Sequence, residues 1–86
     1  VQLIYDILAE NRENSLAIRI RDYLLDNISN TEISSESIAQ HFGYNSDYLR
    51  RIFKEKYSTT PLEYLGEQRF ICAKKWLKNI YSHRNR

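Results

Sequence analysis

The sequence is poor in residues that interrupt helices and in residues that build covalent or metal sites. Its 86 residues include two Gly, one Pro, one Cys and two His. A single cysteine, Cys72, excludes an intrachain disulfide and fits a reducing interior, so a cytoplasmic location is expected. His41 and His83 stand far apart with no carboxylate or thiol group at ligand spacing. The sequence therefore predicts no metal site, and no cofactor is expected.

The sequence also has no visible motif for membrane insertion, secretion or catalysis. No apolar run approaches the length of a transmembrane helix and no signal peptide is visible, so membrane contact by this segment is not expected. No nucleophile–base set, phosphate-binding Gly loop or pair of catalytic carboxylates stands out, which argues against an enzyme. The chain starts at Val1 rather than at Met, which indicates a piece of a longer protein.

The residues that are present favour helices. Hydrophobic residues make up 42% of the chain, and Leu, Ile, Arg, Lys and Glu recur at helical spacing.

The charge is uneven along the chain. Residues 1–42 hold three Lys/Arg and seven Asp/Glu, a balance of −4, whereas residues 43–86 hold ten and four, a balance of +6. An all-α domain with one side suited to a polyanion is the resulting expectation.

The segment 34–56 predicts two short helices joined by a tight turn. Ser34 is placed to cap the first helix, and Gly43 permits the positive φ that ends it. Asn45 is suited to cap a second helix from Ser46 to about Lys56. Two short helices that meet across such a turn are typical of a helix-turn-helix unit, whose second helix usually enters the major groove of DNA.

The second helix has two faces. Leu49, Ile52 and Phe53 form an apolar stripe at i, i+3, i+4 spacing. A mostly cationic stripe runs elsewhere on the helix, through Asp47, Arg50, Arg51 and Lys54. From the residues alone, an ordinary solvated surface and a DNA-reading surface are about equally supported.

The flanking segments complete a bundle of about four to five helices. Residues 1–14 are predicted to be a connector, with a short helix over 1–9 and a polar loop over 10–14. The short helix carries Leu3, Ile4, Ile7 and Leu8 on one side, which either packs on the core or leads to an upstream module. Ser15 is predicted to cap a helix that ends near Ile28. Its core face is expected to hold Leu16, Ile20, Tyr23, Leu24 and Ile28.

This scaffold helix and the central pair form a predicted three-helix unit over 15–60. Thr60-Pro61 predicts the start of a long linker helix to about Ile80, and 81–86 reads as a frayed tail. The apolar stripe of the linker helix comprises Leu62, Leu65, Phe70, Ala73, Trp76, Leu77 and Ile80. Arg69 is expected to pair with Glu63 or Glu67 on the same helix.

The run 23–77 resembles the DNA-binding region of AraC/XylS-type transcription regulators. The resemblance is carried in order by Ile38-Ala39, Gly43-Tyr44, Tyr48-Leu49, Arg51, Phe53-Lys54-Glu55, Thr60-Pro61, Tyr64-Leu65, Arg69, Ala73 and Trp76-Leu77. The chain departs from the family pattern at Ser58, where Gly is usual, at Asn45, where Ser is frequent, and at Trp76, where Leu is usual. The family has two helix-turn-helix units joined by a long helix, and only the first is recognisable here.

The resemblance implies sequence-specific binding to double-stranded DNA, with base contacts from the exposed face of the second short helix. That face maps onto Ser46, Asp47, Arg50 and Arg51. Arginine suits bidentate contact with guanine, whereas Asp47 either accepts from a cytosine amino group or orients an arginine, the second being favoured two to one. Phosphate contacts are predicted from Ser35, Lys54 and Lys56.

The resemblance also implies partners for the longer protein. RNA polymerase is expected as a partner of the full-length regulator, and dimerisation is expected through a region upstream of this chain. The competing interpretation is a helical protein-interaction module whose cationic face docks an acidic partner. Salt-dependent binding to duplex DNA separates the two.

Overall fold

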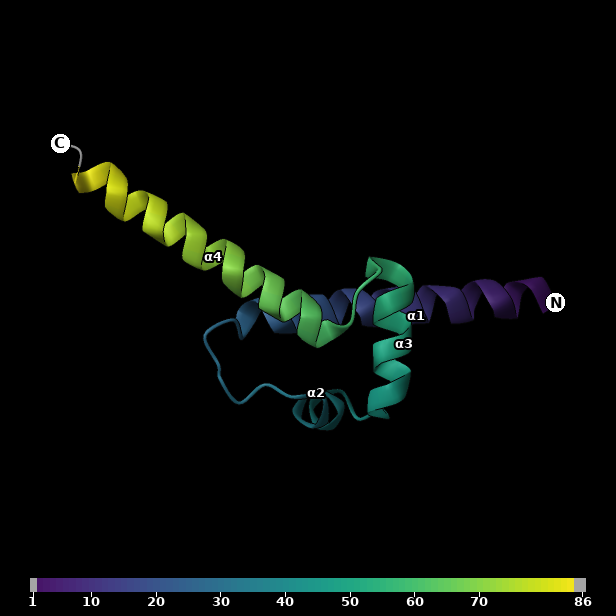
Figure 1. The fold of residues 1–86 in the computed structure, drawn as a ribbon. Coiled ribbons are helices and arrows are strands. Elements are labelled where there is room, and N and C mark those ends of the chain that lie inside the picture. The colour runs from purple at the N-terminus through teal and green to yellow at the C-terminus, as the bar shows by residue number, and fades with distance from the viewer. Residues whose placement is uncertain (1, 85–86) are drawn as a thin grey trace.

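The computed structural model describes the backbone of residues 2–84 and the side chains of residues 11–77. All secondary structure in that part of the chain is helical, as predicted: α1 Gln2–Asp26, α2 Ser35–Phe42, α3 Ser46–Tyr57 and α4 Pro61–Arg84. The two short helices lie beside the C-terminal half of α1 and the start of α4, and the outer parts of α1 and α4 project in opposite directions (Figure 1). The molecule is therefore elongated, with extents of 65 × 25 × 17 Å.

The core lies where α1 meets α3 and α4 and where α2 meets α3. All four helices contribute its buried side chains, which are Leu16, Ile20, Leu24, Ile38, Leu49, Ile52, Phe53 and Leu65. The predicted core face of the scaffold helix is confirmed, because Tyr23 and Ile28 also pack against this cluster. Burial of each large apolar side chain stabilises the fold by about 1.5–3 kcal/mol, so this cluster fixes α3 against its neighbours.

The predicted caps of α2 and α3 and the turn between these helices are confirmed. The Ser34 hydroxyl accepts a hydrogen bond from the Ser37 amide at 3.1 Å, and the Ser34 amide donates to the Ser37 hydroxyl at 2.8 Å. Gly43 ends α2 in the left-handed conformation, with φ 74°. The Asn45 side chain then accepts from the Asp47 amide at 2.8 Å, so α3 begins where the sequence predicts it.

The turn between α3 and α4 has a left-handed residue as well. Ser58 adopts φ 63° and donates its amide to the Lys54 carbonyl at 2.8 Å, so it ends α3 as a glycine would. Thr60 caps α4 as predicted, because its hydroxyl accepts from the Glu63 amide at 3.3 Å. Ser58 thus adopts the left-handed conformation that suits glycine, the residue that the family usually has at this position.

The prediction of two separate N-terminal segments is wrong. α1 runs without a break from Gln2 to Asp26, through the expected loop at 10–14 and past the expected cap Ser15. The loop segment contains Glu and Arg, which are good helix formers, and neither Gly nor Pro, so nothing in it stops a helix. The helix also ends at Asp26 rather than near Ile28. The side chains of residues 1–10, including the apolar ones predicted to pack or connect, lie outside the described part.

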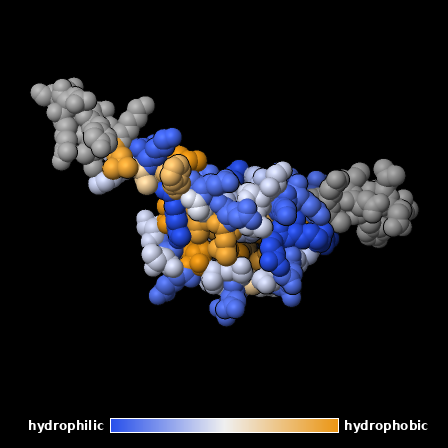
Figure 2. Space-filling model, viewed as in Figure 1, coloured by the Kyte–Doolittle hydropathy of each residue, from blue (hydrophilic) through white to orange (hydrophobic). Residues whose placement is uncertain are grey.

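The second long helix also differs from expectation. α4 continues to Arg84, beyond the predicted end near Ile80 and into the segment predicted to fray. Of its predicted apolar stripe, Leu65 is buried, whereas the other members with described side chains are exposed: Leu62, Phe70, Ala73, Trp76 and Leu77. Figure 2 shows hydrophobic surface at the centre of one face and further patches along α4, amid hydrophilic side chains. The stripe fails as a core face because α4 leaves the body of the molecule after its first turns.

Arg69 joins α4 to the end of the scaffold helix. Its guanidinium donates to the Ile28 carbonyl at 2.8 Å and to the Asn30 carbonyl at 2.7 Å. The expected ion pair with Glu63 or Glu67 is therefore replaced by contacts to backbone oxygens that no helix satisfies. Arg69 still has a structural role, but it contacts the loop that follows α1 rather than a carboxylate of its own helix. Neither α1 nor α4, as far as the structure describes them, has an apolar stretch that could cross a membrane.

Candidate nucleic-acid interface

The candidate interface is the outward face of α3, and the core determines which side chains it holds. Leu49, Ile52 and Phe53 are at most 2% exposed and turn one side of α3 inward. At about 100° per residue, Asp47 and Lys54 then lie on the opposite side of the helix, with Arg50 and Arg51 beside them. All four are exposed. The predicted division of α3 into an apolar and a cationic face is therefore what the packing produces.

Arg50 and Asp47 form an ion pair one turn apart on α3. The two side chains are 56% and 77% exposed, so the pair is open to solvent. Asp47 also lies in the first turn of α3, where a negative charge is favourable. Of the two predicted roles for Asp47, orientation of an arginine is the one that its geometry matches.

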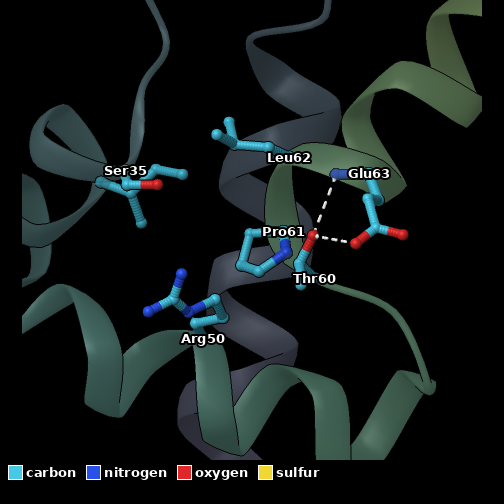
Figure 3. Close-up of a pocket in the computed structure, with 7 residues that line it drawn as sticks. Ser35, Arg50, Thr60, Pro61, Leu62 and Glu63 are labelled. Carbon is cyan, nitrogen blue, oxygen red and sulfur yellow. Dashed lines mark hydrogen bonds between the residues drawn. The ribbon is translucent and has the colours of Figure 1, made fainter.

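Arg50 also lies beside the starts of two other helices. It lines a hollow of about 230 Å³ with Ser35 at the start of α2 and with Thr60 and Pro61 at the start of α4. Figure 3 shows Arg50 beside Pro61, with Ser35 across the hollow and the Thr60–Glu63 cap beyond Pro61. Helix starts present amide groups that suit an anion. The structure thus brings together the predicted base reader Arg50 and the predicted phosphate contact Ser35.

Arg51 is the more restrained of the two arginines. Its guanidinium pairs with Glu55 on α3 at 3.2 Å and with Glu13 on α1 at 3.7 Å. Its terminal carbon also lies 5.3 Å from the centre of the Tyr48 ring, within cation–π range. Burial and, next, the nearby Glu13 carboxylate raise the pKa of the Tyr48 phenol. Arg51 is nevertheless 53% exposed, so part of its guanidinium faces solvent.

The remaining predicted contacts are divided between two sides of α3. Ser46 is partly exposed at the first position of α3, next to its cap Asn45. Lys54 is exposed on the outward face. Lys56 lies roughly 160° around the helix from Lys54, and its ammonium contacts the Asn14 side chain of α1. Lys54 and Lys56 therefore cannot serve one patch of phosphates, although each remains a predicted phosphate contact.

Sequence reasoning missed Glu13 and Glu55 as partners of Arg51. The Arg51–Glu55 pair was detectable, because its i,i+4 spacing places the two on one side of a helix. The Glu13 contact was not, because it depends on where α1 crosses α3 and because residues 10–14 were predicted to be a loop. Within the described residues, no three His, Cys, Asp or Glu side chains gather as metal ligands would.

The arrangement of α1, α2 and α3 is that of a helix-turn-helix unit. Residues 28–65 match the family model described as bacterial regulatory helix-turn-helix proteins, AraC family. This segment of the chain is therefore similar to the helix-turn-helix of AraC-family regulatory proteins. The match spans α2, α3 and the first turn of α4. No curated protein and no solved structure matches the chain significantly.

Proposed function

We propose that the protein binds double-stranded DNA in a sequence-dependent manner, with α3 in the major groove. The observation that carries the proposal is the outward face of α3, where Arg50, Arg51 and Lys54 are exposed together while the opposite side is buried. An α-helix fits the major groove, and arginine matches the paired acceptors of guanine. The match of residues 28–65 to a family of DNA-binding regulators supports the same conclusion.

We assign the base contacts to Ser46, Asp47, Arg50 and Arg51, with Arg50 as the principal reader. Among the described side chains, the ion-pair partner of Arg50 is Asp47 of its own turn, which leaves the guanidinium directed toward solvent. Ser35 and Lys54 would meet phosphates beside the groove, whereas Lys56, which contacts Asn14 of α1, would meet a phosphate only after leaving that contact. One such helix neutralises few phosphates, so binding by this unit alone is expected to be weak, with a non-specific Kd of about 10⁻⁴–10⁻⁶ M at physiological salt.

For the full-length regulator, we propose RNA polymerase as a partner, dimerisation through an upstream region, and action in the cytoplasm, where bacterial DNA is found. On this view the chain divides once within α1 and again at the start of α4. The first part of α1 is a connector, 15–60 form the DNA-binding unit, and α4 is a linker. Tight binding then requires a second unit or a second copy, because each adds its own phosphate contacts.

The test is a fluorescence-anisotropy titration on duplex DNA at several salt concentrations. A DNA-binding protein loses affinity linearly on a log–log plot against salt, with a slope near −0.9 per neutralised phosphate. Lys54→Ala should weaken all duplexes alike and make the slope shallower by about one. Lys75→Ala, which removes an exposed lysine of α4, is the matched control and should change the slope less.

Two results would contradict the proposal. One is binding that does not depend on salt, and the other is equal effects of the lysine changes on α3 and α4. If the protein does not bind duplex DNA but binds an acidic polypeptide through α3, the result would support the protein-interaction alternative instead.

A further inference from the structure

Arg51 differs from Arg50 in that one of its partners lies on another helix. Arg50 pairs with Asp47 and Arg51 pairs with Glu55, and both of these carboxylates move with α3 itself. Glu13 belongs to α1, and its carboxylate lies 3.7 Å from the Arg51 guanidinium. Whether Arg51 keeps this contact therefore depends on how α1 lies against α3.

The Glu13 contact is part of a packed junction and not an isolated surface pair. Glu13 is only 35% exposed at the point where α1 crosses α3. Tyr48, whose ring stands beside Arg51, also has a raised phenol pKa in part because of the Glu13 carboxylate. One carboxylate of α1 thus acts on two neighbouring side chains of α3.

This junction limits what Arg51 can do on DNA. A bidentate contact to guanine requires two N–H groups on one edge of the guanidinium to be free and correctly aimed. The Glu55 carboxylate accepts a hydrogen bond from one terminal nitrogen of Arg51, and the Glu13 carboxylate lies 3.7 Å from the other, at ion-pair distance. Together the two carboxylates more than balance the charge of the one guanidinium. A contact with a base edge therefore competes with these two carboxylates for the Arg51 guanidinium.

Resting on the proposed function, we propose that Glu13 is a positioning residue that withholds Arg51 from DNA. Because α1 is a single helix from Gln2 to Asp26, a displacement of its first half by an attached module would move Glu13 relative to α3. Such a displacement releases Arg51, so the position of α1 sets how much Arg51 contributes to sequence preference. The group that is regulated in this way is the Arg51 guanidinium, at the edge of the outward face of α3.

The test compares Glu13→Gln with Asp26→Asn, both measured by anisotropy on a preferred and a scrambled duplex. Each variant removes one negative charge from α1, but Asp26 is exposed at the far end of the helix, where it lines a surface with His41 and Phe42. Glu13→Gln should tighten binding to the preferred duplex about two- to fivefold more than Asp26→Asn does, as suits a partly exposed ion pair. In an Arg51→Ala background this advantage should disappear.

A second measurement does not depend on DNA. An NMR titration of the Tyr48 phenol should give a lower pKa in Glu13→Gln than in the unchanged protein, because one cause of the raised pKa has been removed. An unchanged Tyr48 pKa would show that Glu13 is not at the junction and would overturn the inference.

The outcomes separate this inference from the proposed function. If the unchanged protein shows no salt-dependent binding to duplex DNA, the proposed function fails. If it binds DNA but Glu13→Gln matches Asp26→Asn, weakens binding, or keeps its advantage without Arg51, then DNA binding stands and the role of Glu13 is overturned.

Discussion

The two faces of α3 have the same backbone but very different surroundings. On the inner face, Leu49, Ile52 and Phe53 are buried against side chains from the other three helices. On the outer face, Arg50 and Arg51 are more than half exposed and contact mainly other charged groups. The inner face determines where the helix lies, and the outer face determines what it can bind. A change on one face should therefore leave the property of the other largely intact.

The largest effect is expected from the inner face. Phe53 is fully buried, with its ring centre 4.7 Å from that of Tyr57 and 5.5 Å from that of Tyr64. Phe53→Ala should lower the free energy of unfolding by about 3–5 kcal/mol, a large part of the stability of a small domain. Urea unfolding followed by circular dichroism measures this loss. Phe53→Leu, which keeps most of the volume, should cost clearly less, and equal losses in both variants would contradict the packing described.

A smaller effect is expected at the turn that orients α3. Gly43 has φ 74°, and an added Cβ would meet no atom within 4 Å, so Gly43→Ala tests the backbone alone. It should lower stability by about 1–2 kcal/mol, because a side chain is unfavourable in the left-handed region. Gly66→Ala is the matched control in the second turn of α4, where the space is equally open. It should raise stability by up to about 1 kcal/mol, because Ala favours helices over Gly. The same sign in thermal unfolding of both variants would argue against this account of the turn.

The smallest effect is expected at the other left-handed turn. Ser58 adopts φ 63° with a side chain where glycine would be unstrained. Ser58→Gly should raise the free energy of unfolding by about 0.5–1 kcal/mol, since relief of strain exceeds the added entropy of the unfolded chain. Ser29→Gly is the comparison, because Ser29 is exposed and does not have a positive φ. A loss of stability in Ser58→Gly similar to that in Ser29→Gly would show that Ser58 is not strained.

Features that depend on a few neighbouring residues could be predicted from the sequence. The caps at Ser34, Asn45 and Thr60 and the turn at Gly43 follow from the chemistry of single side chains and amides. The inner face of α3 followed from its apolar spacing. The orientation of the outer face then followed automatically, because a helix with one buried side has its opposite side fixed.

Features that depend on contacts between distant segments could not be predicted. Arg69 was assigned to its own helix because nothing local indicates that the Ile28 and Asn30 carbonyls lie within reach. The segment 10–14 was judged by its polarity, although its propensities permit a helix. Glu13 was missed for the same reason, and with it the restraint on Arg51.

Arg50→Lys tests the central claim most directly, because it keeps the positive charge and removes the guanidinium that can grip guanine with two hydrogen bonds. The quantity to measure is the ratio of affinities for a preferred and a scrambled duplex, with the preferred one selected from a random pool by the unchanged protein. The account predicts that this ratio falls about tenfold or more, while affinity for the scrambled duplex and thermal stability stay nearly constant. An unchanged ratio, or an equal loss on both duplexes, would contradict base reading by α3.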